Sequence, residues 1–106
     1  MSQTQLLKGV LDGCVLQIIS EREIYGYELV QALKEVGFTK IIGGTVYPLL
    51  QKLERNGYII GELKPSPDGP ARKYFTITEK GNQFLTEFWQ QWEELTQTVS
   101  RLSGSG

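Results

Sequence analysis

The sequence predicts a mainly α-helical domain with one small β-hairpin, followed by a long C-terminal helix. Three observations predict this class. Apolar residues recur at helical spacing through the first half of the chain, and from Tyr58 to Ile77 the pattern changes to that of short strands. A heptad pattern then runs from Leu85 to Leu102. With 106 residues, we expect one core and no second, catalytic domain.

The first expected helix carries an apolar stripe in pairs four residues apart, which is typical of an amphipathic helix. The polar run Glu21-Arg22-Glu23 indicates that this helix ends near Ser20. Cys14 lies on the stripe, so we expect a small buried hydrophobe rather than a redox centre. The stripe comprises Leu6, Leu7, Val10, Leu11, Cys14, Val15, Ile18 and Ile19.

Two further helices are expected before the hairpin. The second spans residues 26–36, and Gly37 ends it because glycine accepts a left-handed conformation without a Cβ penalty. The third begins near Gly44 or Thr45, since Pro48 is tolerated only in the first turn of a helix. Residues 56–57, Asn-Gly, close it.

Residues 58–64 and 72–77 are rich in β-branched and aromatic side chains and predict two strands. The six turn-forming residues 65–70, Pro-Ser-Pro-Asp-Gly-Pro, lie between them and predict a hairpin with a projecting tip. Three prolines should keep the strand ladder from extending into this tip. Three helices followed by such a hairpin define a winged helix-turn-helix, whose third helix enters the major groove of DNA.

The last helix is expected to begin after Thr78, a typical N-cap, and to reach about Leu102. A heptad seam beyond a complete small domain needs a partner surface, and a second copy of the chain is the simplest one. Phe84 and Trp89 should instead pack back on the body. We therefore expect a DNA-binding domain over residues 1–77, a dimerisation helix over 78–103 and a flexible tail over 104–106. The seam comprises Leu85, Phe88, Trp92, Leu95, Val99 and Leu102.

Charge is unevenly distributed along the chain. The formal net charge is −1, but residues 40–80 carry seven basic against four acidic side chains. The segments on either side are both net acidic, so we expect the middle third to be the part that binds a polyanion. The chain has no histidine, which removes the commonest general base and the usual zinc ligand, so we expect no catalytic residue, metal or cofactor. The single cysteine and the lack of a signal peptide or long apolar run favour a cytoplasmic protein without a membrane partner.

Three motifs in order resemble the short form of the PadR family of bacterial transcriptional regulators. They are YGYEL at 25–29, GTVYPLLQKLERNGYI at 44–59 and ARKYFTITEKG at 71–81, and the resemblance extends from Leu6 to about Leu102. It implies a homodimer that binds double-stranded operator DNA with inverted symmetry, usually as a repressor, with release by a small effector in some members. The positions it implies for DNA binding are Gly44, Thr45, Val46, Tyr47, Lys52, Arg72 and Lys73. Asp68 departs from the basic or glycine-rich wing tip of many members, which argues against insertion of the tip into the minor groove.

The resemblance also suggests an effector site, because Trp92 matches a position that lines a cavity in multidrug-binding members. Phe88, Trp89 and Trp92 would then bind a flat apolar or cationic molecule. Packing in the dimer core is the alternative explanation for these rings.

Other candidate positions also have two interpretations. Tyr47 could face DNA or the core, and Lys52 and Arg55 could meet phosphates or only solvent. Arg72 and Lys73 alternate along a strand, so a regular strand would turn at most one toward DNA unless it twists. Tyr25 and Tyr27 are expected mainly to pack. The alternative function is a winged-helix protein-interaction module without DNA binding.

Overall fold

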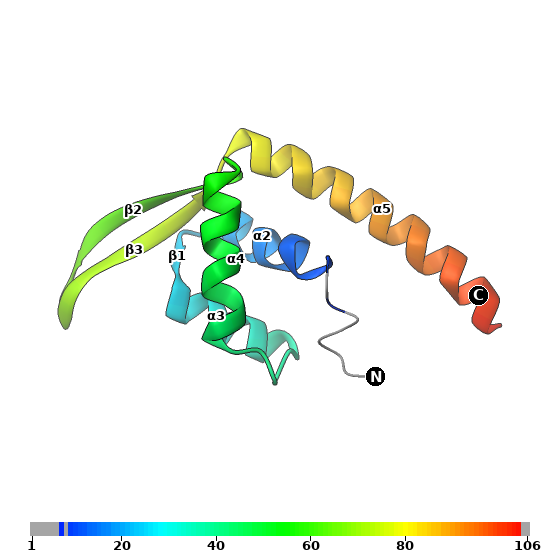
Figure 1. Ribbon diagram of the computed structural model, residues 1–106, viewed down its shortest axis with the longest axis horizontal. Coiled ribbons are helices and arrows are strands. Elements are labelled where there is room, and N and C mark those ends of the chain that lie inside the picture. Colours follow the sequence, from blue (N-terminus) through cyan, green and yellow to red (C-terminus); the bar gives the residue numbers. More distant parts are fainter. Residues whose placement is uncertain (1–6, 8, 105–106) are drawn as a thin grey trace.

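The computed structural model describes residues 7 and 9–104, and it confirms the predicted fold class. Residue Leu6 of the predicted stripe and residues 105–106 of the predicted tail lie outside the described residues. The β2–β3 hairpin and helix α5 leave the body of helices in opposite directions (Figure 1). The elements, in order, are α2 (Leu11–Glu21), β1 (Ile24–Tyr25), α3 (Gly26–Val36), α4 (Gly43–Arg55), β2 (Ile59–Ser66), β3 (Gly69–Ile77) and α5 (Glu79–Ser103).

The first predicted helix is interrupted, so the expectation of one continuous helix from Leu6 is wrong. Gly9 has a φ of +88°, a left-handed conformation that ends an α-helix, and the Val10 N–H donates to the Leu7 carbonyl at 2.8 Å. Helix α2 begins only at Leu11. The apolar stripe did not reveal the break because apolar side chains continue on both sides of Gly9.

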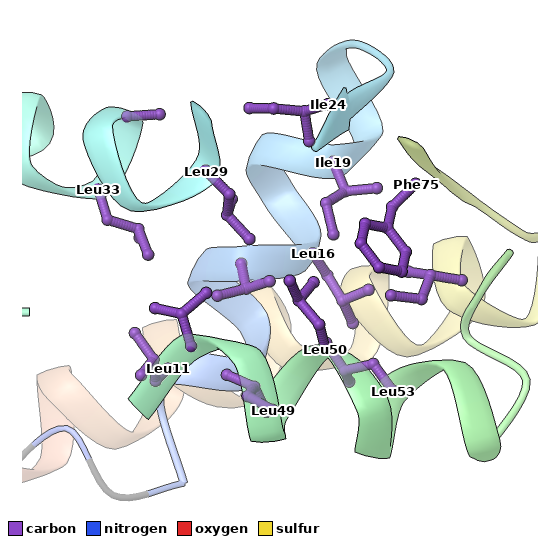
Figure 2. Packing of buried hydrophobic residues seen from close by; sticks show 14 of the residues in the cluster. Leu11, Leu16, Ile19, Ile24, Leu29, Leu33, Leu49, Leu50, Leu53 and Phe75 are labelled. Atoms are coloured by element: carbon purple, nitrogen blue, oxygen red, sulfur yellow. The ribbon is translucent and has the colours of Figure 1, made fainter. Parts of the chain in front are cut away.

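The core lies between helices α2, α3 and α4 and the base of the sheet, as Figure 2 shows. No polar or charged side chain is buried among the described residues. Each fully buried leucine or isoleucine contributes about 1.5–3 kcal/mol relative to exposure. Cys14 is half-buried and packs against this core, as predicted, and burial raises the pKa of its thiol. The labelled core residues are Leu11, Leu16, Ile19, Ile24, Leu29, Leu33, Leu49, Leu50, Leu53 and Phe75.

Helix α3 has the predicted bounds, and Gly37 ends it at a φ of +135°. Its first turn is fixed by Glu28, whose carboxylate accepts a hydrogen bond from the Tyr25 N–H at 3.4 Å.

Helix α4 begins earlier than expected. The extended residue Ile42 is its N-cap, and the Ile42 carbonyl accepts from the Val46 N–H at 3.2 Å. Gly43 is therefore the first helical residue, and Pro48 lies in the second turn, so the expectation that it lies in the first turn is wrong. Pro48 has no N–H to donate to the Gly44 carbonyl one turn back.

The sheet has three antiparallel strands in the order β1-β3-β2. Strand β1 was not predicted, because two residues are too few to show a period. The β2–β3 ladder continues to the pair Ser66↔Gly69, so the expectation that the prolines would stop it is wrong. An irregularity between Lys64 and Ser66 accommodates Pro65, and β2 is an edge strand, where proline is tolerated.

Helix α5 starts as predicted. The Thr78 hydroxyl accepts from the Gly81 N–H at 3.0 Å and donates to the Gly57 carbonyl at 2.7 Å, which joins the helix to the end of α4. Its first turns pack on the body, and the remainder projects away from it (Figure 1). Leu85 is only 7% exposed and belongs to the core of its own chain. Its assignment to the dimer seam is therefore corrected.

Candidate nucleic-acid interface

Helix α4 has one face that packs into the core and one face that is exposed. Val46 is 0% exposed and packs with the leucines of α4 in the core. The Val46 side chain therefore faces the core, because residues 46, 49, 50 and 53 all fall on the buried side, and only its backbone could take part in the predicted DNA binding. Gly44, Thr45 and Tyr47 are exposed at the start of the helix.

Tyr47 is held between two glycines. A Cβ at Gly26 would overlap one edge of the Tyr47 ring, and a Cβ at Gly43 would come within 2.7 Å of the opposite edge. The ring therefore fits between the first residues of α3 and α4, while the side chain stays 47% exposed. Both interpretations of Tyr47 are thus partly met: the ring packs and the residue remains accessible.

A hollow of about 390 Å³ lies between α3, α4 and strand β3. Arg72 and Lys73 both border it, although they alternate along the strand. The Arg72 guanidinium lies 4.6 Å from the centre of the Tyr25 ring, and its hydrogen bond to Tyr74 raises the pKa of Arg72. The hollow is lined by Tyr25, Gly26, Tyr27, Tyr47, Leu50, Gln51, Glu54, Arg72, Lys73 and Phe75.

The two tyrosines at the start of α3 have different roles. Tyr25 is half-buried and packs edge-on against Tyr74, with ring centres 5.3 Å apart, as expected of a packing residue. Tyr27 stays 60% exposed at the rim of the hollow. Tyr27 is therefore accessible to a ligand on this face, and Tyr25 supports the position of Arg72.

Three lysines of α4 and the wing are in ion pairs that the sequence did not predict. Lys52 Nζ lies 2.8 Å from an Asp12 carboxylate oxygen. Lys64 Nζ lies 2.7 Å from Glu23, and this hydrogen bond raises the pKa of Lys64.

The third pair joins Lys73 Nζ to Glu54 at 2.6 Å. The partners in the three pairs are between 19 and about 40 residues apart in sequence, so only the folded chain brings them together.

A second cavity, of about 430 Å³, lies between α2, the end of α3 and α5. Phe88, Trp89 and Trp92, the three predicted effector residues, all line it. The Trp89 indole N–H donates to the Gln17 side-chain oxygen at 2.9 Å, which confirms that Trp89 packs back on the body. The remaining lining is almost entirely apolar and comprises Leu7, Val10, Cys14, Gln17, Ile18, Glu21, Leu33, Val36 and Phe38.

The outer part of α5 carries an apolar face that its own chain leaves open. Leu95 and Val99 are 56% and 53% exposed, and Leu102 is exposed as well. Phe88, at the inner end of the predicted seam, packs on Gly13 of α2, where a Cβ would overlap its ring. The open seam is therefore shorter than predicted and begins at Trp92.

Other kinds of site have no counterpart in the part of the chain that the structure describes. Residues 7 and 9–104 contain no group of three or more His, Cys, Asp or Glu side chains placed to hold a metal ion. Within the same residues, no helix is long and apolar enough to cross a membrane.

The three-helix body, the two-stranded wing and the exposed start of α4 define the class as a winged helix-turn-helix. The model of the PadR-like transcriptional regulator family matches residues 15–87. The chain belongs to this family of transcriptional regulators.

Solved structures agree with this assignment. A Streptococcus transcriptional regulator is 55% identical, with 97% of this chain and 99% of that chain covered and a TM-score of 0.84. A PadR-like transcriptional regulator from Bacillus cereus is 50% identical, with 92% and 95% covered and a TM-score of 0.83. The structure of Bacillus subtilis PadR in complex with operator DNA is 27% identical, with 76% of this chain and 46% of that chain covered and a TM-score of 0.69. The matched proteins are transcriptional regulators rather than enzymes.

Proposed function

We propose that the chain is a homodimeric repressor that binds an operator with inverted symmetry and is released by a small effector. The observation that carries the DNA-binding part is the exposed start of α4, where Tyr47 is fixed between Gly26 and Gly43 beside the cationic base of the wing. Bacillus subtilis PadR, a relative with the same fold, is known in complex with operator DNA. In this proposal residues 1–77 bind DNA, and the helix of residues 78–103 dimerises the chain.

The side chains on the proposed DNA face have separate tasks. Thr45 and Tyr47, on the first turns of α4, contact base edges and the adjacent backbone in the major groove. Lys52, Arg72 and Lys73 contact phosphates, whose neutralisation supplies most of the affinity. The positive end of the α4 dipole also favours a nearby phosphate. In a two-fold dimer the two α4 helices should lie about 34 Å apart, one turn of DNA.

The experiment that tests this function is fluorescence anisotropy with the intergenic DNA upstream of the protein's own gene. A scrambled duplex of the same composition is titrated in parallel, at two salt concentrations. Tight, salt-sensitive binding that favours the upstream duplex supports the proposal. Binding of a folded protein to neither duplex favours the alternative, a winged-helix module that binds another protein.

Two substitutions separate sequence reading from phosphate binding. Tyr47→Ala is expected to weaken binding to the operator about tenfold or more, with little change on scrambled DNA, because a base contact is lost. Lys52→Ala should weaken binding to both duplexes and lower the salt slope by up to about 0.9 per protomer. Arg101→Ala, which removes the same charge near the far end of α5, is the control and should change neither quantity. Equal losses on both duplexes for Tyr47→Ala would contradict its proposed role.

The effector part of the proposal rests on the cavity beside Trp89 and Trp92. A planar aromatic cation such as 9-aminoacridine is expected to quench the tryptophan fluorescence saturably, since aromatic walls bind flat cations. Trp92→Leu should remove most of the quenching while the circular dichroism spectrum stays unchanged, because Trp92 lies at the open edge of the cavity. Since Trp89 lines the same cavity and remains fluorescent, unchanged quenching of Trp89 in Trp92→Leu would show that the ligand does not bind against Trp92.

A further inference from the structure

The three ion pairs share one arrangement. In each, the lysine belongs to α4 or the wing, the elements proposed to face DNA, and the carboxylate comes from a different element than its lysine. Asp12 lies in α2, Glu23 follows α2, and Glu54 lies near the end of α4. Both partners of every pair remain partly exposed, with side-chain exposures between 22% and 46%.

The ion pairs reduce the net positive charge around the basic residues 40–80. By sequence, residues 40–80 carry a surplus of basic side chains. Asp12 and Glu23 come from the acidic first third and fold onto two of those lysines, and Glu54 neutralises a third. Glu54 is already counted in that range, so Asp12 and Glu23 are the carboxylates that folding adds, and they make the face proposed to meet DNA less positive than the sequence indicates.

The Glu54–Lys73 pair lies in a space that the fold leaves for it. A Cβ at Gly61 of β2 would come within 2.9 Å of Glu54 Oε2 and would also overlap the aliphatic end of Lys73. The Lys73 ammonium lies 5.6 Å from the centre of the Phe75 ring. This pair borders the same hollow as Tyr47, so it lies next to the residue proposed to read bases.

An exposed ion pair is weak and exchangeable, so a phosphate can displace the carboxylate. The displaced carboxylate then lies unpaired in the negative potential of DNA, which opposes the exchange. Binding to random DNA depends almost wholly on phosphate neutralisation, and a free, flexible lysine can reach a phosphate in any register. At an operator, base contacts fix the register and supply free energy that does not depend on these lysines.

We propose that Asp12, Glu23 and Glu54 are specificity-determining residues, which weaken binding to random DNA by competing with its phosphates for Lys52, Lys64 and Lys73. This inference rests on the proposed DNA-binding function. It assigns to the acidic residues a role in the ratio of operator affinity to random-DNA affinity. Neither their sequence positions nor the net charge indicates such a role.

The test measures the dissociation constants for operator and scrambled duplexes over a series of salt concentrations. Glu54→Gln, Glu23→Gln and Asp12→Asn should each tighten binding to scrambled DNA about three- to tenfold and steepen its salt slope by up to about 0.9 per freed lysine. Operator affinity should rise less, so the ratio of the two affinities falls. Glu62→Gln is the matched control for Glu54→Gln and Asp12→Asn, since Glu62 is an exposed carboxylate of β2 outside the three pairs. Glu62 helps to raise the pKa of Lys64, so the control for Glu23→Gln is Glu35→Gln, at an exposed carboxylate of α3.

A double substitution shows whether the effect passes through the lysine. In a Lys73→Gln background, Glu54→Gln should change binding to scrambled DNA no more than Glu62→Gln does. Equal effects of Glu54→Gln and Glu62→Gln in the wild-type background would overturn the inference. So would weaker operator binding by the amide variants, because the carboxylates would then position the lysines for DNA. A folded wild-type protein that binds neither duplex overturns the proposed function and this inference together, whereas normal wild-type binding with unchanged variants overturns the inference alone.

Discussion

Gly26→Ala is expected to weaken operator binding by at least tenfold and to lower the free energy of unfolding by about 1–3 kcal/mol. The added Cβ would overlap the edge of the Tyr47 ring, which must then leave its position between α3 and α4. Gly26 does not have a positive φ, so its backbone accepts alanine without strain. Alanine also restricts the unfolded chain more than glycine does, which opposes any loss of stability, so a loss reports the clash with the ring. Chemical denaturation and anisotropy measure the two effects.

A double-mutant cycle tests this explanation. In a Tyr47→Ala background the obstructing ring is absent, so Gly26→Ala should cost no further stability and no further operator affinity. Gly44→Ala is the control for stability, because a Cβ there meets only Ile42 at 3.5 Å, an ordinary contact distance. Equal stability losses for Gly26→Ala in both backgrounds would show that the clash is not with Tyr47.

The elements that the sequence predicted well are those with several turns or several alternating residues. Helix α3, the cap at Thr78 and the two wing strands each carry a period or a capping signal that acts within a few residues. Strand β1 could not be found in this way, because two residues show no period and their pairing partner lies about fifty residues away. The break at Gly9 was hidden for a different reason, since the apolar pattern continues across it.

The heptad pattern of α5 illustrates a limit of periodicity. Such a pattern identifies which residues share one face of a helix, but it does not say which surface covers them. Leu85 and Phe88 are covered by their own chain, while Leu95 and Val99, with the same spacing, are not. The difference arises because α2 packs on α5 at Phe88 and does not cover Leu95 and Val99. The heptad spacing contains no information on this packing.

The sequence predicted the candidate site only in part, because contacts between residues far apart in the chain leave no local pattern. Tyr47, Arg72 and Lys73, which the motifs indicated, all border one hollow. They did not reveal the glycine on α3 that holds Tyr47, or the carboxylates that pair with the lysines, because these contacts join residues far apart in the chain. A glycine between two tyrosines in the first motif was the one local signal that could have indicated a close approach at residue 26.

The open face of α5 is the proposed interface with a second copy of the chain. Leu95→Glu combined with Val99→Glu is expected to convert the protein to a monomer and to weaken operator binding at least a hundredfold. Burying each of these side chains against a second copy would contribute about 1.5–3 kcal/mol, whereas an unpaired carboxylate in the same place costs several kcal/mol. A monomer also loses the gain in affinity from engaging two half-sites at once. Analytical ultracentrifugation and anisotropy measure the two outcomes.

The control places the same two charges on the other side of the helix. Gln90→Glu with Gln97→Glu lies on the face of α5 opposite Leu95 and Val99, as the helical spacing requires, so it should leave both the mass and the operator affinity unchanged. Since Leu95 and Val99 are more than half exposed, their replacement should leave the helical content of the chain intact. A Leu95→Glu, Val99→Glu protein that stays dimeric would exclude this seam as the interface. A monomeric variant with full operator affinity would instead separate dimerisation from DNA binding. That outcome would contradict the proposal that two joined copies read the two half-sites with their α4 helices.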